Sequence, residues 1–497
     1  MLFNSHIFIF VFLPIVLLGF HLIGNQGHHR IAISWLVGSS FFFYGWWNPA
    51  YLGLILASII FNYAIGIVLS GKQSKLILMF GITINLGLLG YFKYLNFFIT
   101  NLNVLVNGNL YLEQIILPLA ISFFTFQQIT YIIDAYGGLT KEYNFLHYTL
   151  FVTFFPQLIA GPIVHHKEIL PQFSNDTNFK LKASNISVGI TIFILGLFKK
   201  VVFADHIASY VNPVFSAAEN GIMLTFFEAW MGALAYTFQL YFDFSGYSDM
   251  AIGLARMFGV VLPVNFYSPY KANSIIDFWR RWHITLSRFL REYIYIPLGG
   301  DRKGKVRRYI NLMTTMLLCG LWHGAGWTFI IWGGMHGIFL SINHAWKVIV
   351  NILFPHRKSN FFIVTKCFGR FITFTSVIIA WVMFRSEDFN DAFCMYSAMF
   401  GFNGISFQEM FTNGIIGNAK KGVLILFSML VIVWFLPNTL DWLRGEKPAL
   451  GLNLFFTKRT KILIWKPCMT YSVFLAILFF MAVINISKYS EFLYFNF

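Results

Sequence analysis

The sequence predicts an all-α membrane protein that crosses the bilayer many times. Hydrophobic residues make up 57% of its 497 positions and charged residues only 11%, whereas a soluble domain carries roughly 25% charge. The mean hydropathy is +0.66, and phenylalanine alone occurs 60 times. A soluble fold of this length could not bury so much apolar side chain, because a folded surface must remain wet. We therefore expect lipid to surround most of the chain.

Uninterrupted apolar windows locate the candidate spans, because a transmembrane helix needs about 20 predominantly apolar residues. Several windows contain no charged residue, namely 50–69, 76–92, 115–133, 422–440 and 468–486. Further candidates lie at 7–23, 31–47, 145–164, 183–198, 224–242, 309–321, 325–345 and 371–384. We expect about 11–13 membrane-embedded helices, some of them short or tilted.

No polar stretch is long enough to form a separate soluble domain, so residues 1–497 are predicted to form one integral membrane domain. Its functional core is expected at about residues 239–336, where polar residues gather between lipid-like helices. Residues 487–497 form a C-terminal tail. The four cysteines are scattered and form no CxxC pair, so we expect neither a disulfide framework nor a metal site.

The charge balance is strongly basic, with 36 Lys and Arg against 20 Asp and Glu, a net charge of +16. In a membrane protein this excess indicates cytoplasmic loops that contact anionic lipid, rather than a nucleic-acid partner. The densest basic loop is 301–308, which we expect on the cytoplasmic side. A basic rim there would also attract an anionic cofactor.

Two aspartates lie in the segment 239–249, among apolar and aromatic residues. A carboxylate in the hydrocarbon costs at least about 2.5 kcal/mol, so Asp243 and Asp249 should face the bundle interior or water and have partners. The structural interpretation is that they satisfy helix ends or pair with arginines. Direct catalytic work is the alternative.

The segment 277–293 reads as one amphipathic helix with a basic face. Its apolar face carries Trp279, Trp282, Leu286 and Leu290, with His283 at the edge. Its other face carries Arg280, Arg281, Arg288 and Arg291. This pattern suits a helix at the membrane interface. Either the helix only anchors the chain, or His283 faces a buried site while the arginines contact phosphates or lipid headgroups.

The segment 320–327, Gly-Leu-Trp-His-Gly-Ala-Gly-Trp, places His323 in an apolar run. Burial in lipid would keep its imidazole neutral, and a neutral imidazole is a competent general base. The small residues around it would let another backbone or a thin acyl chain approach closely. A structural role is the alternative for His323 and equally for His336. Cys319, four residues before His323, adds a Cys–His nucleophile pair as a further alternative.

Three long stretches and the N-terminus together carry a resemblance to a known family. They read FDFSGYSDMAIG, DFWRRWHITLSRFLREYIYIPLGG, GLWHGAGWTFIIWGGMHG and, at the start, MLFNSHIFIFVFLP. These resemble the bacterial membrane-bound O-acyltransferase (MBOAT) family, and within it the alginate O-acetyltransferase type, which includes peptidoglycan-acetylating proteins. The similarity covers nearly the whole chain. It implies an assembly of tilted helices around a funnel or tunnel through the membrane.

The resemblance also implies a site and its substrates. The family's functional histidines correspond to His323 in GLWHG and His283 in RRWH, which lie 40 residues apart. The implied donor is acetyl-CoA from the cytoplasm, with no metal. The implied final acceptor is a polysaccharide outside the bacterial cytoplasmic (inner) membrane, reached through an SGNH-type transferase or another acyl-accepting partner.

On this interpretation His323 is the general base that deprotonates the acceptor hydroxyl, and His283 positions or polarises the thioester. Phosphates of the coenzyme would be held by charge-assisted hydrogen bonds from Arg280, Arg281, Arg288 and Arg291. Lipid headgroups are the alternative partners of these arginines.

The C-terminus supplies a third candidate catalytic residue, Tyr494. The ending FLYFNF is similar to the aromatic C-terminal motif of the small companion protein of D-alanylation systems, in which a tyrosine is thought to relay the acyl group. The basic stretch 441–467 is expected in the cytoplasm, so the uncharged span 468–486 would put the tail on the far side. We expect Tyr494 to carry the acetyl group transiently. An interfacial aromatic anchor is the alternative.

Two other functions stay open. One is D-alanyl or other acyl transfer to a cell-envelope polymer, with the donor on a carrier protein. The other is a transporter or flippase without covalent chemistry, because intramembrane aspartates and histidines also suit proton-coupled transport. Release of free thiol from acetyl-CoA would exclude the transporter.

Overall fold

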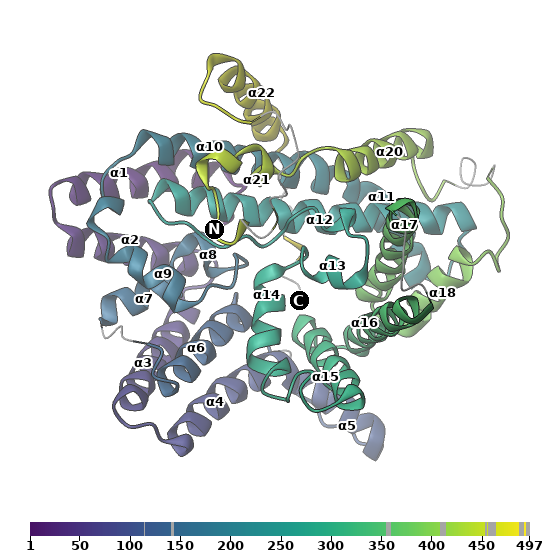
Figure 1. The fold of residues 1–497 in the computed structure, drawn as a ribbon, viewed down its shortest axis with the longest axis horizontal. Coiled ribbons are helices and arrows are strands. Elements are labelled where there is room, and N and C mark those ends of the chain that lie inside the picture. The colour runs from purple at the N-terminus through teal and green to yellow at the C-terminus, as the bar shows by residue number, and fades with distance from the viewer. Residues whose placement is uncertain are drawn as a thin grey trace. The chain divides into compact units, whose positions relative to one another are not determined.

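The computed structural model describes residues 1–113, 115–140, 144–353, 359–407, 414–452, 455, 464–486 and 492–493. Within these ranges the chain forms helices and connecting loops and contains no β-strand (Figure 1). The described part holds five helical segments long and apolar enough to cross a membrane: Phe8–Asn25, Tyr51–Gly71, Lys75–Val106, Ala183–Glu219 and Lys366–Arg385. The protein is therefore an all-α polytopic membrane protein. The total of about 11–13 embedded helices stays a prediction.

The helices divide between two compact units. The first unit comprises Met1–Val201, Gly246–Val264 and the described residues between Thr439 and Leu493, and the second comprises the described residues of Val202–Ser245 and Asn265–Asn438. The long helix α12 (Phe226–Met257) contributes residues to both.

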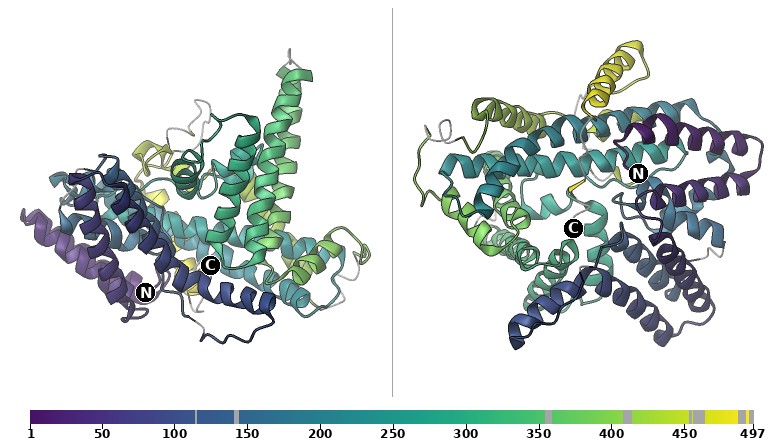
Figure 2. Two further views of the ribbon diagram at one scale, coloured as in Figure 1. Left: turned by 90° about the horizontal axis from the view of Figure 1, so that it is seen from below. Right: turned by 180° about the vertical axis from the view of Figure 1, so that it is seen from behind.

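The first unit is built from pairs of apolar helices. A short π-helix, Phe8–Phe12, continues into α1, which lies side by side with α2 (Figures 1 and 2). The helices α3, α4 and α6 pack together, and α10 packs against α22. The bounds are α1 Leu13–Asn25, α2 His29–Gly45, α3 Tyr51–Gly71, α4 Lys75–Leu89, α5 Leu95–Val106, α6 Ile121–Tyr136, α7 Phe145–Thr153, α8 Phe155–Leu158, α9 His166–Phe173, α10 Ala183–Phe198, α21 Thr439–Trp442 and α22 Met469–Asn485.

Buried amides join the apolar helices of the first unit. Asn62 on α3 and Asn85 on α4 exchange two side-chain hydrogen bonds, of 3.1 and 2.7 Å. Ser58 on α3 accepts a hydrogen bond from Gln128 on α6 at 3.1 Å. Between apolar helices, such bonds supply attraction that lipid-like side chains do not.

The second unit contains the predicted functional core. Its helices α15 and α16 run side by side, and α16 also packs against α13 and α17. The bounds are α11 Asp205–Glu219, α13 Ile275–Trp279, α14 Ile284–Leu290, α15 Lys305–His323, α16 Trp327–Leu353, α17 Ser359–Arg385, α18 Phe389–Met399 and α20 Ala419–Phe435.

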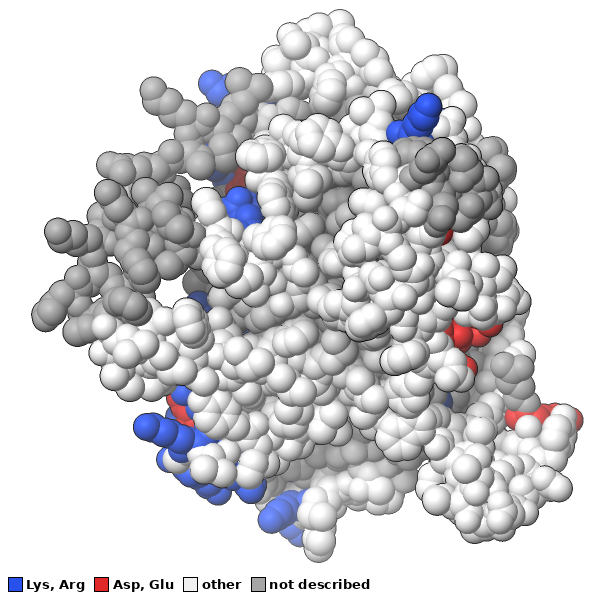
Figure 3. All heavy atoms as spheres, turned by 90° about the vertical axis from the view of Figure 1, so that its right-hand side faces the viewer, with Lys and Arg blue, Asp and Glu red and all other residues white. Residues whose placement is uncertain are grey.

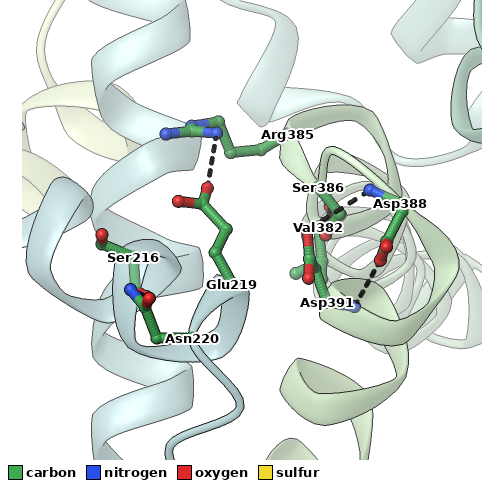
Figure 4. A network of polar contacts seen from close by, with 8 residues as sticks. All are labelled: Ser216, Glu219, Asn220, Val382, Arg385, Ser386, Asp388 and Asp391. Atoms are coloured by element: carbon green, nitrogen blue, oxygen red, sulfur yellow. Dashed lines mark hydrogen bonds and ion pairs between the residues drawn. The ribbon is translucent and has the colours of Figure 1, made fainter.

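Charged side chains form hydrogen bonds and an ion pair at helix ends in the second unit, as Figure 4 shows. Arg385, at the end of α17, donates a hydrogen bond to Glu219, at the end of α11, over 3.4 Å. Asp388 caps α18 by accepting from the backbone N–H of Asp391 at 3.0 Å. The caps satisfy N–H groups that a helix start leaves without intrahelical partners.

Two predicted spans differ from the structure. The window 145–164 is not one helix, because α7 ends at Thr153 and the short α8 begins at Phe155 with Pro156 in its first turn. Proline lacks the N–H that a continuing helix needs and restricts the residue before it. The window 115–133 is helical only from Ile121, after Ala120 in the left-handed region at φ +62°.

The predicted amphipathic helix 277–293 is also wrong as a single element. Helix α13 ends at Trp279 and α14 begins at Ile284, with His283 between them at φ +42°. A left-handed residue cannot continue a right-handed helix. The break therefore separates Trp279 from Leu286 and Leu290, and it sets the direction of His283.

Candidate active site

His283 occupies a strained turn that Asn265 holds in place. The backbone carbonyl of Asn265 accepts from the N–H of Ile284 at 2.9 Å. Its side-chain Oδ1 accepts from the backbone N–H and the hydroxyl of Thr285, at 3.3 and 2.9 Å. These bonds stabilise a left-handed conformation that costs a non-glycine residue free energy. Both Asn265 and His283 are fully buried.

The same amide fixes the tautomer of His283. Its Nδ1 lies 3.2 Å from Asn265 Oδ1. Because that oxygen accepts from a backbone N–H, it is the carbonyl end of the amide and can only accept. His283 therefore donates from Nδ1, and its neutral ring carries the lone pair on Nε2. Burial lowers the pKa of His283 to about 3, so the ring is neutral at physiological pH.

His323 is the last residue of α15, and it is 3% exposed. Its ring packs edge-on against Trp322, Trp332 and Phe384, with ring centroids 4.9, 4.9 and 5.4 Å away. The helix stops there because Gly324 adopts an extended conformation. His323 is thereby held at a helix end among aromatic rings.

The two predicted histidines meet at a shared tryptophan. The ring of Trp322 lies 6.1 Å from that of His283 and 4.9 Å from that of His323, between centroids. His283 also packs against Phe244 of α12 at 4.9 Å. Tertiary folding thus brings together two residues from separate sequence motifs, inside one aromatic cluster of the second unit.

Glycines allow α15 and α16 to approach closely enough to build this cluster. A Cβ on Gly320 would lie 2.2 Å from the carbonyl oxygen of Phe329, and one on Gly333 would lie 2.2 Å from that of Met316. No real side chain fits such a space. The close backbone approach predicted for the glycine-rich segment is confirmed, and its partner is α16.

A third histidine, His336 on α16, belongs to the same cluster. It is fully buried, and its Nδ1 accepts a hydrogen bond of 3.2 Å from the indole N–H of Trp279. The ring of Trp332 lies 4.9 Å from the rings of both His336 and His323.

A cavity of about 570 Å³ lies beside this cluster, a volume typical of small-molecule sites. Trp279 is part of its wall. Its lining includes four arginines, a histidine and one acidic residue, namely Arg280, Arg291, Arg302, Arg308, His344 and Asp301. Arg308 contacts His344.

Only two of the four arginines predicted to bind the donor therefore lie at the cavity. Arg280 and Arg291 line the cavity. Arg281 instead forms an ion pair of 2.8 Å with Asp277 and lies over the ring of Tyr267, and Arg288 is not part of the cavity lining. Arg302 and Arg308, which belong to the basic stretch 301–308 expected to attract an anionic cofactor, join the first two.

The remaining candidates have simpler placements. Asp249 forms an ion pair of 2.6 Å with Lys199 in the first unit, so its role there is structural, although its partner is a lysine and not the expected arginine. Asp243 is buried in the second unit on α12. Cys319 is fully buried on α15. Tyr494 lies outside the described residues. Among the described residues no group of three or more His, Cys, Asp or Glu is arranged to hold a metal ion.

Sequence reasoning missed Asn265 and the role of Trp322. Asn265 stands alone as an amide between Val264 and Phe266, and that isolation in an apolar run was the available signal. Its pairing with a residue 18 positions later could not be inferred from periodicity. Trp322 reads as an ordinary apolar residue of a helix.

The described chain is thus a helical membrane protein in which buried histidines lie beside a basic cavity. The comparisons with known proteins define the class. The model of MBOAT, the membrane-bound O-acyltransferase family, matches residues 136–384. The chain belongs to the membrane-bound O-acyltransferase family, and it is an acyltransferase.

Several relatives resemble the chain over most of its length. It is 42% identical to the peptidoglycan O-acetyltransferase of Helicobacter pylori, over 92% of this chain and 94% of that protein. It is 39% identical to the probable alginate O-acetylase AlgI of Pseudomonas putida, over the full length of both. The teichoic acid D-alanyltransferase of Streptococcus thermophilus is 29% identical, over 56% of this chain and 70% of that protein.

Proposed function

We propose that this protein is an O-acetyltransferase of the bacterial cytoplasmic membrane. It takes an acetyl group from acetyl-CoA on the cytoplasmic side and passes it across the membrane, for O-acetylation of a polysaccharide such as alginate or peptidoglycan. The observation that carries the proposal is the meeting of His283 and His323 at Trp322, beside a cavity lined by arginines. Relatives about 40% identical over most of the chain carry acetyl-transfer names.

His323 acts as the general base in this proposal. It takes the proton of the attacking hydroxyl while that oxygen bonds to the acetyl carbonyl carbon. The carbon–sulfur bond then breaks, and the proton on His323 passes to the departing thiolate. Coenzyme A leaves as the free thiol, and His323 returns to its neutral form. The aromatic rings around His323 keep water away from the thioester.

His283 positions the donor. Its Nε2 bears a lone pair because Nδ1 donates to Asn265. A ring in this state accepts a hydrogen bond, for instance from an amide N–H of the pantetheine arm. Of the two roles expected for His283, this geometry favours positioning over polarising, because polarising a carbonyl requires a donated hydrogen.

The basic cavity binds the coenzyme. A diphosphate and a 3′-phosphate give coenzyme A several negative charges, and four arginines against one aspartate complement them. A pantetheine arm on a carrier protein brings a single phosphodiester into such a site. The charge of the lining therefore favours acetyl-CoA over a carrier-bound D-alanyl donor. The higher identity to acetylating relatives than to the D-alanyltransferase agrees with this choice.

Tyr494 receives the acetyl group in a relay. Its phenol is the hydroxyl that His323 deprotonates, so that the first product is an acetyl ester on Tyr494. A hydroxyl of the partner, an SGNH-type transferase or other acyl-accepting protein, then attacks the ester. The phenol is regenerated by the proton which that hydroxyl loses.

Release of free thiol by purified protein in proteoliposomes tests the function. Acetyl-CoA is supplied with the partner acceptor, and thiol is followed with a chromogenic disulfide. We expect turnover by the wild type and a loss of about 10²–10⁴-fold in His323→Ala, with normal insertion and purification. Equal thiol release by both proteins would overturn the assignment of the base. No release by well-folded wild type would overturn acetyl-CoA as donor.

A further inference from the structure

The aromatic cluster contains a hydrogen-bond donor that the proposed mechanism does not yet use. It belongs to His336, which is fully buried on α16. An indole N–H can only donate, so the bond from Trp279 fixes His336 Nδ1 as an acceptor. The neutral ring therefore carries its proton on Nε2.

This Nε2–H group has no hydrogen-bond partner among the described residues. A buried polar group without a partner costs free energy, and native proteins rarely leave one without a reason. Asn265 and Trp279 give His283 and His336 opposite tautomers. His283 presents an acceptor at Nε2, and His336 presents a donor.

The position of His336 on its helix links the base to the cavity. Trp332, one turn before it, packs against the ring of His323. Leu340, one turn after it, lines the arginine cavity, as does Trp279. Residues four apart lie on one helix face, so His336 lies between the contact with the base and the donor cavity.

We propose that His336 is a further catalytic residue, whose Nε2–H donates a hydrogen bond to the carbonyl oxygen of the donor's acetyl group. Negative charge develops on that oxygen when the attacking hydroxyl adds to the carbonyl carbon. A preformed donor in a buried site stabilises this charge without reorganising. This inference rests on the proposed function, and it supplies the polarising group that the tautomer of His283 cannot provide.

Two variants separate the hydrogen bond from packing. His336→Phe keeps a ring of similar size and removes the donor, and we expect kcat to fall about 10²–10³-fold. The KM for acetyl-CoA should stay within about threefold, since the bond strengthens in the transition state. His336→Gln restores an N–H near Nε2, and its kcat should be at least about tenfold higher than that of His336→Phe. His21→Phe, which removes a buried histidine bonded to Met257 in the first unit, is the control and should leave kcat unchanged.

A spectroscopic measurement tests the wild type directly. ¹⁵N NMR of histidine-labelled protein, assigned through His336→Gln, should give a protonated Nε2 and an unprotonated Nδ1. A dethia analogue of acetyl-CoA keeps the carbonyl and cannot transfer the acetyl group. Its binding should shift the Nε2 resonance of His336, and Trp279→Phe should abolish the fixed tautomer.

The outcomes distinguish this inference from the proposed function. Full kcat in His336→Phe, or no Nε2 shift when the analogue is bound, would show that the N–H only faces an aromatic ring, and would overturn the role of His336. If His336→Phe does not fold, the change in the Nε2 resonance of the wild type on binding the analogue still tests the role of His336. Failure of the wild type to bind the analogue would instead overturn acetyl-CoA as the donor, and with it the proposed function.

Discussion

A single amide, Asn265, sets both the geometry and the tautomer of His283. One side-chain oxygen accepts from Thr285 twice and from His283 Nδ1. The left-handed backbone at His283 is tolerated because these bonds offset its cost. The orientation and tautomer of the His283 ring therefore depend on Asn265.

We predict that Asn265→Ala lowers kcat about ten- to a hundredfold, because losing hydrogen bonds in a buried site costs about 1–3 kcal/mol. Asn265→Asp is the matched control, since a carboxylate accepts from the same donors. It should keep more activity, but its negative charge raises the pKa of His283. Activity of the Asp variant should therefore fall as the pH is lowered through that raised pKa. Thiol release measured against pH checks both variants, and an Ala variant as active as wild type would contradict the prediction.

Tyr494 yields the second prediction at this scale. Tyr494→Phe keeps the ring and deletes the hydroxyl, so an aromatic anchor would tolerate it and a relay would not. We expect polysaccharide acetylation to be lost and no acetyl group to be found on the protein by mass spectrometry of the C-terminal peptide. Tyr471→Phe, in α22, is the control that removes another tyrosine hydroxyl. Unreduced acetylation in Tyr494→Phe would end the relay proposal.

At the scale of elements, hydrophobic patterning predicted which segments are helical better than where they break. The windows at 50–69 and 468–486 correspond closely to α3 and α22. The break at His283 escaped prediction because its cause is Asn265, a residue distant in sequence. The break before Pro156 had a local signal, the proline itself. The window was nevertheless predicted as one span because its composition is apolar.

The candidate site was predictable in part for the same reason. The glycines around His323 predicted that another backbone approaches this segment closely. That prediction needed no knowledge of the fold, because a glycine such as Gly320 permits close approach wherever it stands. The meeting of His283 and His323 followed only from the family resemblance, because spacing along the chain does not determine tertiary contact. Of the arginines that line the cavity, two were predicted as donor-binding residues. Arg302, in the loop before α15, and Arg308, in the first turn of α15, join them through the fold.

The packing of α15 on α16 yields a prediction about stability. Gly320→Ala would place a methyl group 2.2 Å from a backbone carbonyl oxygen, which cannot rotate away. We expect destabilisation by about 1–3 kcal/mol, the usual cost of overpacking. Gly334→Ala is the matched control on α16, because its nearest neighbour is a flexible side-chain atom of Leu317 at 3.5 Å. Thermal unfolding in detergent compares the two, and equal stability of both variants would contradict the packing argument.

At the scale of the whole molecule, the charge distribution is the main guide to orientation. Most atoms on the face drawn in Figure 3 belong to uncharged residues, and Lys and Arg gather in small groups near its margins. In the sequence, basic residues are concentrated in stretches such as 301–308 and 441–467. By the positive-inside rule, such stretches beside membrane helices stay in the cytoplasm.

The basic segment 301–308, a loop that continues into the first turn of α15, makes this orientation testable and connects it to the proposed donor. It carries five basic residues, of which Arg302 and Arg308 also line the cavity. A cytoplasmic loop would therefore place the cavity on the side where acetyl-CoA is made. We predict that a cysteine introduced at Lys305, which is exposed at the start of α15, is not labelled by an impermeant maleimide in intact cells.

Labelling should appear once the cells are permeabilised. Lys305 is a better position than Gly304, where φ is +92° and a side chain would be strained. The exposed Cys367 and Cys468 must first be replaced, since they would react as well. Sealed proteoliposomes of known orientation should then release thiol only when acetyl-CoA is on the side bearing Lys305→Cys. Ready labelling from outside intact cells would invert the topology, and it would move the arginine cavity to the side that lacks coenzyme A.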